Sequence, residues 1–126
     1  MEDFKFQFEK LDAWQEARKL VRNVYLLLEK FPKNENYALC DQMRRAAISV
    51  PSNIAEGTGR MAVKEQIHFL EIAFGSLMEV YCQLQIALDL GYISKEDLQA
   101  IKREVFTTSK LISGLRASKV VKMENH

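Results

Sequence analysis

The chain has 126 residues, of which 48% are hydrophobic, five are glycine and two are proline, so its composition excludes a disordered or low-complexity polymer. The length fits a single domain with one core. The 18 Lys and Arg residues nearly balance 17 Asp and Glu residues, and the net charge of +1 excludes attraction of the whole molecule to nucleic acid or anionic membranes. Any such attraction therefore needs a local patch.

The cysteines and the lengths of the apolar runs indicate where in the cell the protein is located. Cys40 and Cys82 are too few for a disulfide framework and too far apart for a metal or redox pair, and we expect both to be buried. No apolar run approaches the roughly 20 residues of a membrane span, and the N-terminus lacks the apolar region of a signal peptide. We expect a soluble, all-helical protein in the cytoplasm, without membrane partners.

The first nine residues differ in pattern from the rest of the chain. Phe4, Phe6 and Phe8 alternate with polar residues, and a period of two is typical of extended backbone. We therefore expect residues 1–9 to form an extended arm that packs onto a helix or onto a neighbouring subunit.

The first helix is predicted from its apolar spacing. Between Trp14 and Phe31 apolar side chains recur at alternating steps of three and four residues, the seam spacing of packed antiparallel helices. Pro32 ends this helix, because proline lacks an N–H group and disfavours helical angles in the residue before it.

The second helix is predicted from about Tyr37 to Glu56 and carries two stripes. The apolar stripe is Leu39, Met43, Ala46, Ala47, Val50 and Ile54. Its period continues in phase across Pro51, which predicts a kink there and not an end. The polar stripe includes a candidate structural network of Arg45, Ser49, Asn53 and Glu56. In this network Arg45 and Glu56 would be linked through Ser49 or Asn53, and the alternative is that the stripe recognises a ligand.

A third side of the second helix is also apolar. It holds Ile48, Pro51 and Ala55, beside Arg44, roughly opposite the main apolar stripe. A small bundle has only one core, so this strip is predicted to lie under another subunit or under the aromatic arm. Ile48, Pro51 and Ala55 are therefore candidate subunit-interface residues, and the alternative is a lone exposed isoleucine.

The third helix has the clearest seam in the chain, and we expect it to be central. The seam is Ile67, Leu70, Phe74, Leu77, Tyr81, Leu84 and Leu88. Gly75 in its middle predicts close approach by another helix, or else is an exposed glycine without such a role. Gly57 and Gly59 precede this helix, and at least one of them is expected to have left-handed backbone angles.

The fourth helix is predicted to begin at a capping box. Gly91 ends the third helix, and Ser94 and Asp97 have the spacing with which a side chain caps the first turn. The apolar pattern is lost over residues 118–126, which we expect to fray. With short connections throughout, residues 10–117 are predicted to form an all-α, antiparallel up-down-up-down four-helix bundle.

Residues that could perform catalysis or bind a metal do not converge in the sequence. His68 stands alone on its helix, and His126 lies in the tail. Lys64, His68 and Glu71 share one helix face, and a solvated charged surface is the better explanation of that arrangement. No metal, nucleotide-binding or nucleophile motif is present, so we expect no catalytic residues, no metal, no cofactor and no enzymatic activity.

Basic side chains are a better lead to function. The candidate nucleic-acid-binding residues are Arg18, Lys19, Arg22, Arg44 and Arg60. Clustered arginines can hold phosphates with two hydrogen bonds each. The alternative is that these side chains pair with acids on the surface, such as Glu16 and Glu56.

Several blocks of the sequence resemble a known family. They are Leu11-Asp12-Ala13-Trp14-Gln15, Gln42-x-x-Arg45-Ala46-Ala47-x-Ser49, Asn53-Ile54-Ala55-Glu56-Gly57, Arg60, and Phe69-Leu70-x-x-Ala73-x-Gly75-Ser76-Leu77-x-Glu79. Over about residues 10–116 the chain resembles the four-helix bundle family of 23S rRNA intervening-sequence proteins. It departs at Ala62-Val63, where the family often has a Ser or Thr cap, which leaves Thr58 or Gly59 to begin the third helix.

The resemblance implies a bacterial bundle that assembles into a ring-like homopentamer and has no established catalytic activity. The family is similar to the accessory protein of diversity-generating retroelements, a basic pentameric bundle that binds nucleic acid and its reverse transcriptase. This likeness implies RNA or a nucleic-acid-binding protein as partner. We therefore expect a non-enzymatic oligomer that binds RNA or a ribonucleoprotein through surface arginines. The alternative is a protein-interaction scaffold without nucleic-acid affinity, and an enzyme acting on nucleic acid comes third.

Overall fold

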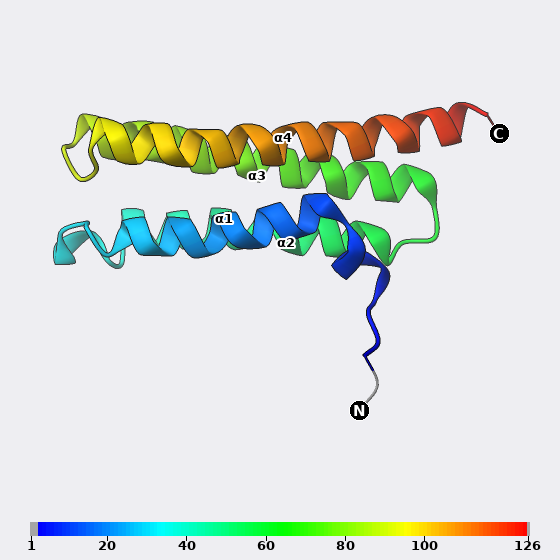
Figure 1. Cartoon of the computed structure of the whole chain (residues 1–126), viewed down its shortest axis with the longest axis horizontal. Helices are drawn as coiled ribbons and strands as arrows, with labels where there is room; N and C mark the ends of the chain where they lie inside the picture. The colour runs from blue at the N-terminus through cyan, green and yellow to red at the C-terminus, as the bar shows by residue number, and fades with distance from the viewer. Residues whose placement is uncertain (1–2, 126) are drawn as a thin grey trace.

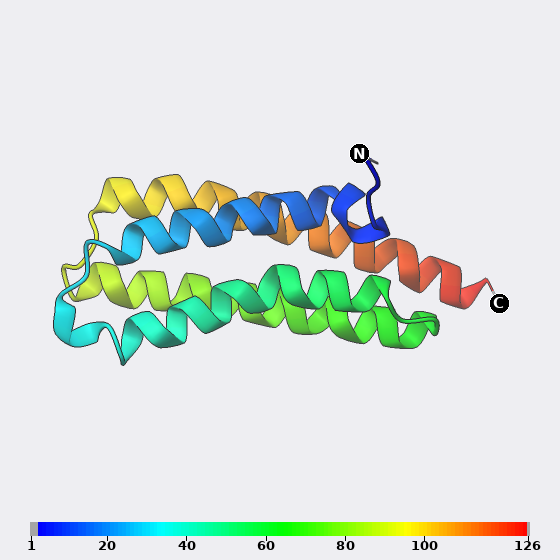
Figure 2. The same ribbon diagram turned by 90° about the horizontal axis from the view of Figure 1, so that it is seen from below.

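The computed structural model describes residues 3–125, and these form an all-α bundle (Figure 1). Its α-helices are α1 (Asp12–Leu28), α2 (Leu39–Thr58), α3 (Val63–Asp89) and α4 (Lys95–Glu124), and its short 3-10 helices are η1 (Gln7–Lys10) and η2 (Lys33–Glu35). Successive helices run in opposite directions, and α1 also packs on α4, so each helix touches two neighbours (Figures 1 and 2). The predicted four-helix bundle is confirmed. Among the described residues, no helix is both long enough and apolar enough to cross a membrane.

The core is built from the predicted seams. The largest fully buried side chains are Leu20, Val24, Met43, Val50, Ile54, Leu77, Val80, Leu84, Thr108 and Ile112. Trp14 and Val21 of α1 and Phe74 of α3 are only partly buried and pack on the edge of this core. Tyr81 and Leu88 of the predicted α3 seam are also only partly buried, whereas Val80, which lies outside that seam, is fully buried. The spacing of three and four residues thus predicted the core face of each helix but not every buried position on it.

The two ends of the chain differ in part from expectation. Residues 3–6 are not helical, but Gln7–Lys10 turns into η1, and the ring centroids of Phe8 and Trp14 lie 4.9 Å apart. The prediction that residues 118–126 fray is wrong for 118–124, which belong to α4. That stretch contains no glycine or proline, so helix propensity continues past the last core contact. Residues 1, 2 and His126 lie outside the described part of the chain.

Pro51 lies inside α2, as predicted. Figure 2 shows the ribbon of α2 bending along its length, as expected where a proline removes one backbone donor. The helix ends without a left-handed residue, since Gly59 has φ −81° and its N–H donates to Glu56 O over 3.1 Å. The expected left-handed glycine at this end is thus wrong. The chain instead continues through a short loop to α3, which begins at Val63 after Ala62 and has no side-chain cap.

The connection from α3 to α4 follows the prediction closely. Gly91 is left-handed, with φ 77°, and its N–H donates to Leu88 O while the Tyr92 N–H donates to Ala87 O. This pair of bonds satisfies two carbonyl groups at the end of α3. Ser94 and Asp97 form the predicted capping box, in which each side chain accepts a hydrogen bond from the backbone N–H of the other.

The same carboxylate joins the ends of two helices and makes stability depend on pH. Lys30 Nζ donates to both carboxylate oxygens of Asp97 at 2.9 Å, and this contact, followed by the Ser94 N–H, lowers the pKa of Asp97 below 3.8. A folded-state pKa below the unfolded one stabilises the fold above pH 3.8, and the contribution is lost as pH falls through the folded value. Asp97→Asn should therefore lower the unfolding midpoint at about pH 6 and have much less effect at about pH 2.5. Thermal unfolding with Glu96→Gln as control tests this, and an equal loss at both pH values would contradict it.

Two positions on α3 differ from expectation. The space around Gly75 is open within one chain, with nothing within 4 Å of the position a Cβ would take, so no helix of the same chain approaches it closely. Cys82 is exposed although Cys40 is buried. Cys82 follows the buried Val80 by two residues, or about 200° around the helix, which places it on the outer surface.

Candidate functional site

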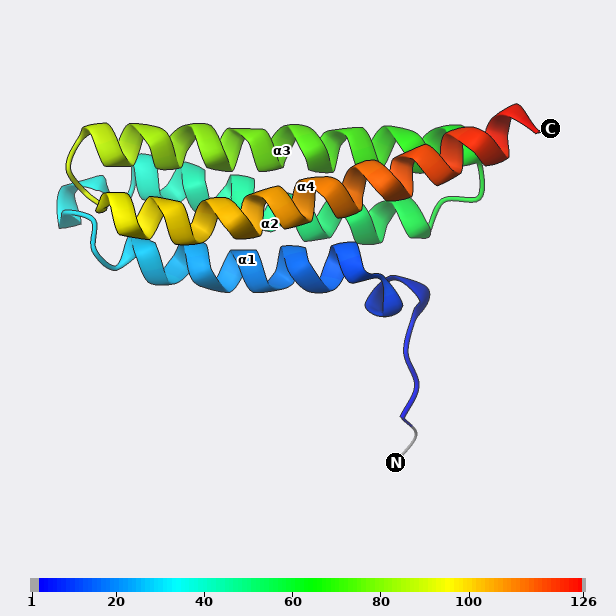
Figure 3. The same cartoon turned by 45° about the horizontal axis from the view of Figure 1, so that its top comes forward.

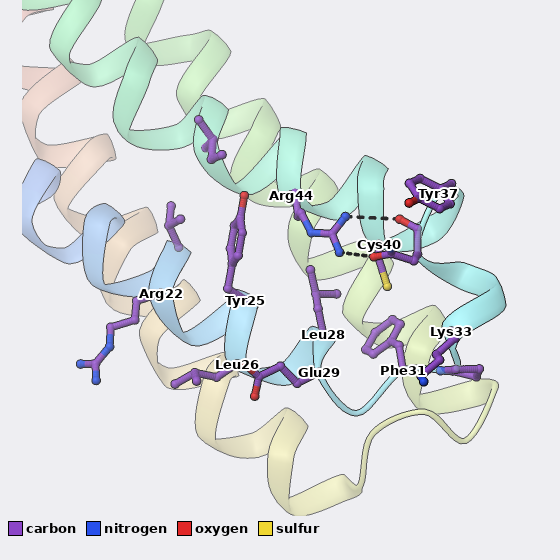
Figure 4. Close-up of a pocket in the computed structure, with 14 residues that line it drawn as sticks. Arg22, Tyr25, Leu26, Leu28, Glu29, Phe31, Lys33, Tyr37, Cys40 and Arg44 are labelled. Atoms are coloured by element: carbon purple, nitrogen blue, oxygen red, sulfur yellow. Dashed lines mark hydrogen bonds between the residues drawn. The ribbon is translucent and has the colours of Figure 1, made fainter.

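A groove runs between α1 and α2 on the surface of the bundle (Figure 4). Its large hollow has a volume of about 950 Å³ and lies where α1 passes through η2 into α2. A small hollow of about 290 Å³ adjoins it toward the start of α1. Val21 and Ile48 line both hollows, so we treat them as one surface, the α1–α2 groove.

The predicted interface residues all lie in this groove. Ile48, Pro51 and Ala55 line the small hollow, together with Trp14 and Arg18 of α1. Ile48 is 45% exposed, although it is apolar. The third side of α2 thus faces away from the bundle core and toward the outer edge of α1. Its role as a subunit contact stays a prediction.

Arg44 lies on the wall of the large hollow and is held by the loop before α2. It donates hydrogen bonds to the carbonyl oxygen of Asn36 at 3.2 Å and to Asn36 Oδ1 at 2.5 Å (Figure 4). These bonds use two of the five N–H donors of the guanidinium and hold the side chain against the loop. Cys40 lies close by, and burial raises the pKa of its thiol, which disfavours the thiolate.

The other basic residues of α1 gather on its outer face. Arg18, Lys19 and Arg22 line a shallow hollow of about 420 Å³ with Gln15 and Glu16. The Arg18 guanidinium carbon lies 5.0 Å from the centroid of the Trp14 ring, a cation–π contact, while Lys19 Nζ is 3.9 Å from Glu16 Oε1. Three of the five predicted cations are therefore brought together, and one nearby acid partly balances them.

Arg60 is not part of this cluster. Its guanidinium donates to Glu56 at 2.9 Å, lies 3.9 Å from Glu65 and covers the Phe69 ring at 4.6 Å from the centroid. Its carbonyl oxygen also accepts a hydrogen bond from Gln66 Nε2 at 2.7 Å. These contacts fix the loop between α2 and α3, so the Arg60 side chain has a structural role. Arg60 therefore fits the alternative prediction, in which the basic side chains pair with acids on the surface.

The polar stripe of α2 forms a smaller network than predicted. The Ser49 and Ser76 hydroxyls lie 2.8 Å apart and join α2 to α3, and Asn53 Nδ2 donates to Ser49 O at 2.8 Å and to Ser49 Oγ at 2.9 Å. Arg45 pairs with Asp41 at 3.0 Å, and Glu56 pairs with Arg60. The expected link between Arg45 and Glu56 is therefore wrong, because each pairs with an opposite charge four residues away, Arg45 with Asp41 on α2 and Glu56 with Arg60 in the loop after it.

The described residues contain no group of three His, Cys, Asp or Glu side chains that could hold a metal ion. Glu71 pairs with Arg116 at 2.6 Å across to α4, while the His68 ring packs edge-on to Phe69 with centroids 5.8 Å apart. Lys64, His68 and Glu71 are all exposed, as expected for a solvated charged face.

A second basic surface was missed by the sequence reasoning. On α4, Lys102, Arg103 and Lys110 are exposed around Phe106, which is itself exposed, and Lys110 Nζ lies 5.6 Å from the centroid of the Phe106 ring. Basic residues three or four positions to either side of an aromatic residue are the signal that could have found it. Ser76 was missed as well, because only the pairing of α2 with α3 shows that it meets Ser49.

The chain resembles known proteins both in sequence and in fold. Residues 9–114 match the family described as 23S rRNA-intervening sequence protein. The chain is also similar to the crystal structure of a protein with unknown function from the S23 ribosomal protein family of Bacteroides thetaiotaomicron, with a TM-score of 0.76 and 18% sequence identity over 82% of this chain and 97% of that chain. At this identity the likeness shows the fold alone. None of the curated proteins matches the chain.

Proposed function

Because this chain belongs to the 23S rRNA-intervening sequence protein family, we propose that it is a non-enzymatic, homo-oligomeric bundle that binds RNA or a ribonucleoprotein through basic side chains of α1. The resemblance implies a pentamer, in which each copy would add one such basic surface. Repetition around a ring gives many weak phosphate contacts in one assembly, so modest charge on each chain is sufficient for binding.

The observation that carries this proposal is the hollow formed by Arg18, Lys19 and Arg22. All three side chains are exposed and lie within about one and a half turns of a single helix. Arg18 is additionally held over the Trp14 ring, which limits the rotamer freedom it would lose on binding a phosphate. Arg44 and Arg60 contribute less, because protein groups already occupy their donors.

The proposal is tested by filter binding of a structured RNA at rising salt. Replacing Arg18, Lys19 and Arg22 together by Glu should weaken binding at low salt by at least about tenfold. The slope of the logarithm of the binding constant against the logarithm of the salt concentration should become shallower by an amount that corresponds to roughly two to three phosphate contacts. Circular dichroism checks that the variant remains helical, as expected for three exposed positions.

The matched control is the triple replacement of Lys102, Arg103 and Lys110 by Glu, which changes the net charge by the same amount on α4. Binding that survives the α4 change and is lost with the α1 change supports the proposal. Equal loss in both variants would assign the binding to overall charge, and loss only with the α4 change would move the site to Phe106 and its neighbours. No binding by the wild-type protein at low salt would reject RNA binding altogether.

The second candidate function is a protein-interaction scaffold without nucleic-acid affinity. The α1–α2 groove favours it, because Tyr25, Leu26 and Ile48 leave apolar surface exposed along the groove. Exposed apolar surface of this kind is typical of protein contacts. The scaffold would become the better description if RNA binding failed while the assembly depended on the groove.

A further inference from the structure

The N-terminal arm carries two phenylalanines that the described part of the chain leaves largely exposed. Phe4 is 67% exposed and Phe6 is 66% exposed, and their ring centroids lie 5.9 Å apart, so they form one apolar pair. Figures 1 and 3 show the arm projecting away from the bundle. The Phe6 N–H donates to Glu9 Oε1 at 3.0 Å, which fixes the end of the arm where it meets η1. Each ring could remove roughly 150 Å² or more from water in a contact.

The α1–α2 groove offers a surface of matching character. Its large hollow has apolar walls that include Tyr25, Leu26 and Ile48, and its charged side chains include Arg22 and Arg44 on one hand and Glu29 on the other. The arm presents aromatic rings with Asp3 before them and Lys5 between them. In an extended segment the two rings lie on one side and Asp3 and Lys5 on the other. In the groove the rings can therefore contact the wall formed by α2, which includes Ile48, while Asp3 faces Arg22 and Lys5 faces Glu29 on the α1 side.

The arm cannot reach the large hollow of its own chain. The arm leaves the bundle where α1 begins (Figure 2), whereas the hollow is lined by the other end of α1, from Val21 to Leu28. Residues 3–6 span at most about 14 Å when fully extended, and η1 holds the residues that follow. Along α1 the distance from Asp12 to Tyr25 is about 20 Å. The rings can therefore enter the large hollow only in another copy.

We propose that the arm of one copy lies in the α1–α2 groove of a second copy, with Phe4 and Phe6 in the large hollow and Lys5 opposite Glu29. This contact joins two different surfaces, so every copy both donates an arm and accepts one. Contacts of that type close into rings when the rotation between copies allows it. The inference does not rest on RNA binding and stands or falls separately from it.

Disulfide trapping between two different chains tests the proposal. One chain carries Lys5→Cys and the other carries Glu29→Cys, both with Cys82→Ser and with tags of different length. These positions are exposed, so folding is expected to be unaffected, and both phenylalanines remain in place. After mixing and mild oxidation, a disulfide-linked pair of the two chains should form at several times the yield of a control in which Lys102→Cys replaces Glu29→Cys.

A second variant distinguishes docking from random collision. Adding Phe4→Asp and Phe6→Asp to the Lys5→Cys chain should reduce trapping to the level of the Lys102→Cys control, because the rings no longer favour the groove. Lys5→Cys mixed with a chain that retains only Cys40 detects links to that buried thiol. Equal yields with Glu29→Cys and Lys102→Cys, or trapping that is unaffected by the loss of both rings, would overturn the proposal.

Discussion

An Ile48→Asp variant is expected to form a smaller species than the wild-type protein. Ile48 is apolar and 45% exposed, and it lines both hollows of the α1–α2 groove. A carboxylate at this position would lose its water if a second copy covered the groove, and pairing with Arg44 one turn away would offset only part of that cost, which is several kcal/mol for a buried charge. Light scattering coupled to size-exclusion chromatography should therefore show a fall in mass toward the single chain, with helicity preserved.

The α3 position Ile86 supplies a matched control for this experiment. It is 43% exposed, close to the value for Ile48, and it does not line the groove. Ile86→Asp should leave the mass unchanged. An unaltered mass for Ile48→Asp would show that the third side of α2 is not a subunit contact. A fall in mass with both variants would show instead that the assembly tolerates no new negative charge.

Gly57→Leu is expected to lower the free energy of unfolding by about 3 kcal/mol, at the upper end of overpacking costs. Gly57 is buried in the last turn of α2, and a Cβ there would lie 3.2 Å from Phe69 Cβ and 3.4 Å from the Gln66 carbonyl oxygen. A leucine side chain would extend further into this contact and push α2 away from α3. Urea unfolding followed by circular dichroism measures the loss.

Gly114→Leu is the control for this substitution. Gly114 lies inside α4, and a Cβ added there would have no neighbouring atom within 4 Å, so the same change meets no obstacle. It should raise stability by about 0.8 kcal/mol, because leucine favours the helix more than glycine does. A neutral effect of Gly57→Leu would mean that Phe69 moves aside at little cost and that the close approach of α2 to α3 is not required.

The fold was predictable because its signals are local and repeated. An apolar seam, such as the one from Ile67 to Leu88, turns one side of a helix toward the core whichever helices pack against it. The connection from Gly91 to Ser94 depends only on a few adjacent residues. The end of α4 was not predictable from its apolar pattern, since helix propensity continues where burial stops. Gly59 was mistaken for a left-handed residue because a glycine can end a helix in more than one way.

The candidate site was predictable only where a single helix determines it. Ile48, Pro51 and Ala55 share one side of α2, and Arg18 and Arg22 share one side of α1, so their grouping follows from spacing. Contacts between elements could not be read in the same way. Arg44 binds the loop at Asn36, and Ser49 meets Ser76, and both depend on how helices and loops are placed in space.

The position of Trp14 makes its intrinsic fluorescence a probe of the α1–α2 groove. It is the only tryptophan in the chain, and its indole contacts both the Phe8 ring and the Arg18 guanidinium at one end of the α1–α2 groove. A phosphate that draws Arg18 off the ring and a neighbouring chain that covers the groove would alter its emission in different ways, the first through a lost charge and the second through lost water. Intrinsic fluorescence can therefore separate ligand binding from assembly in the unmodified chain.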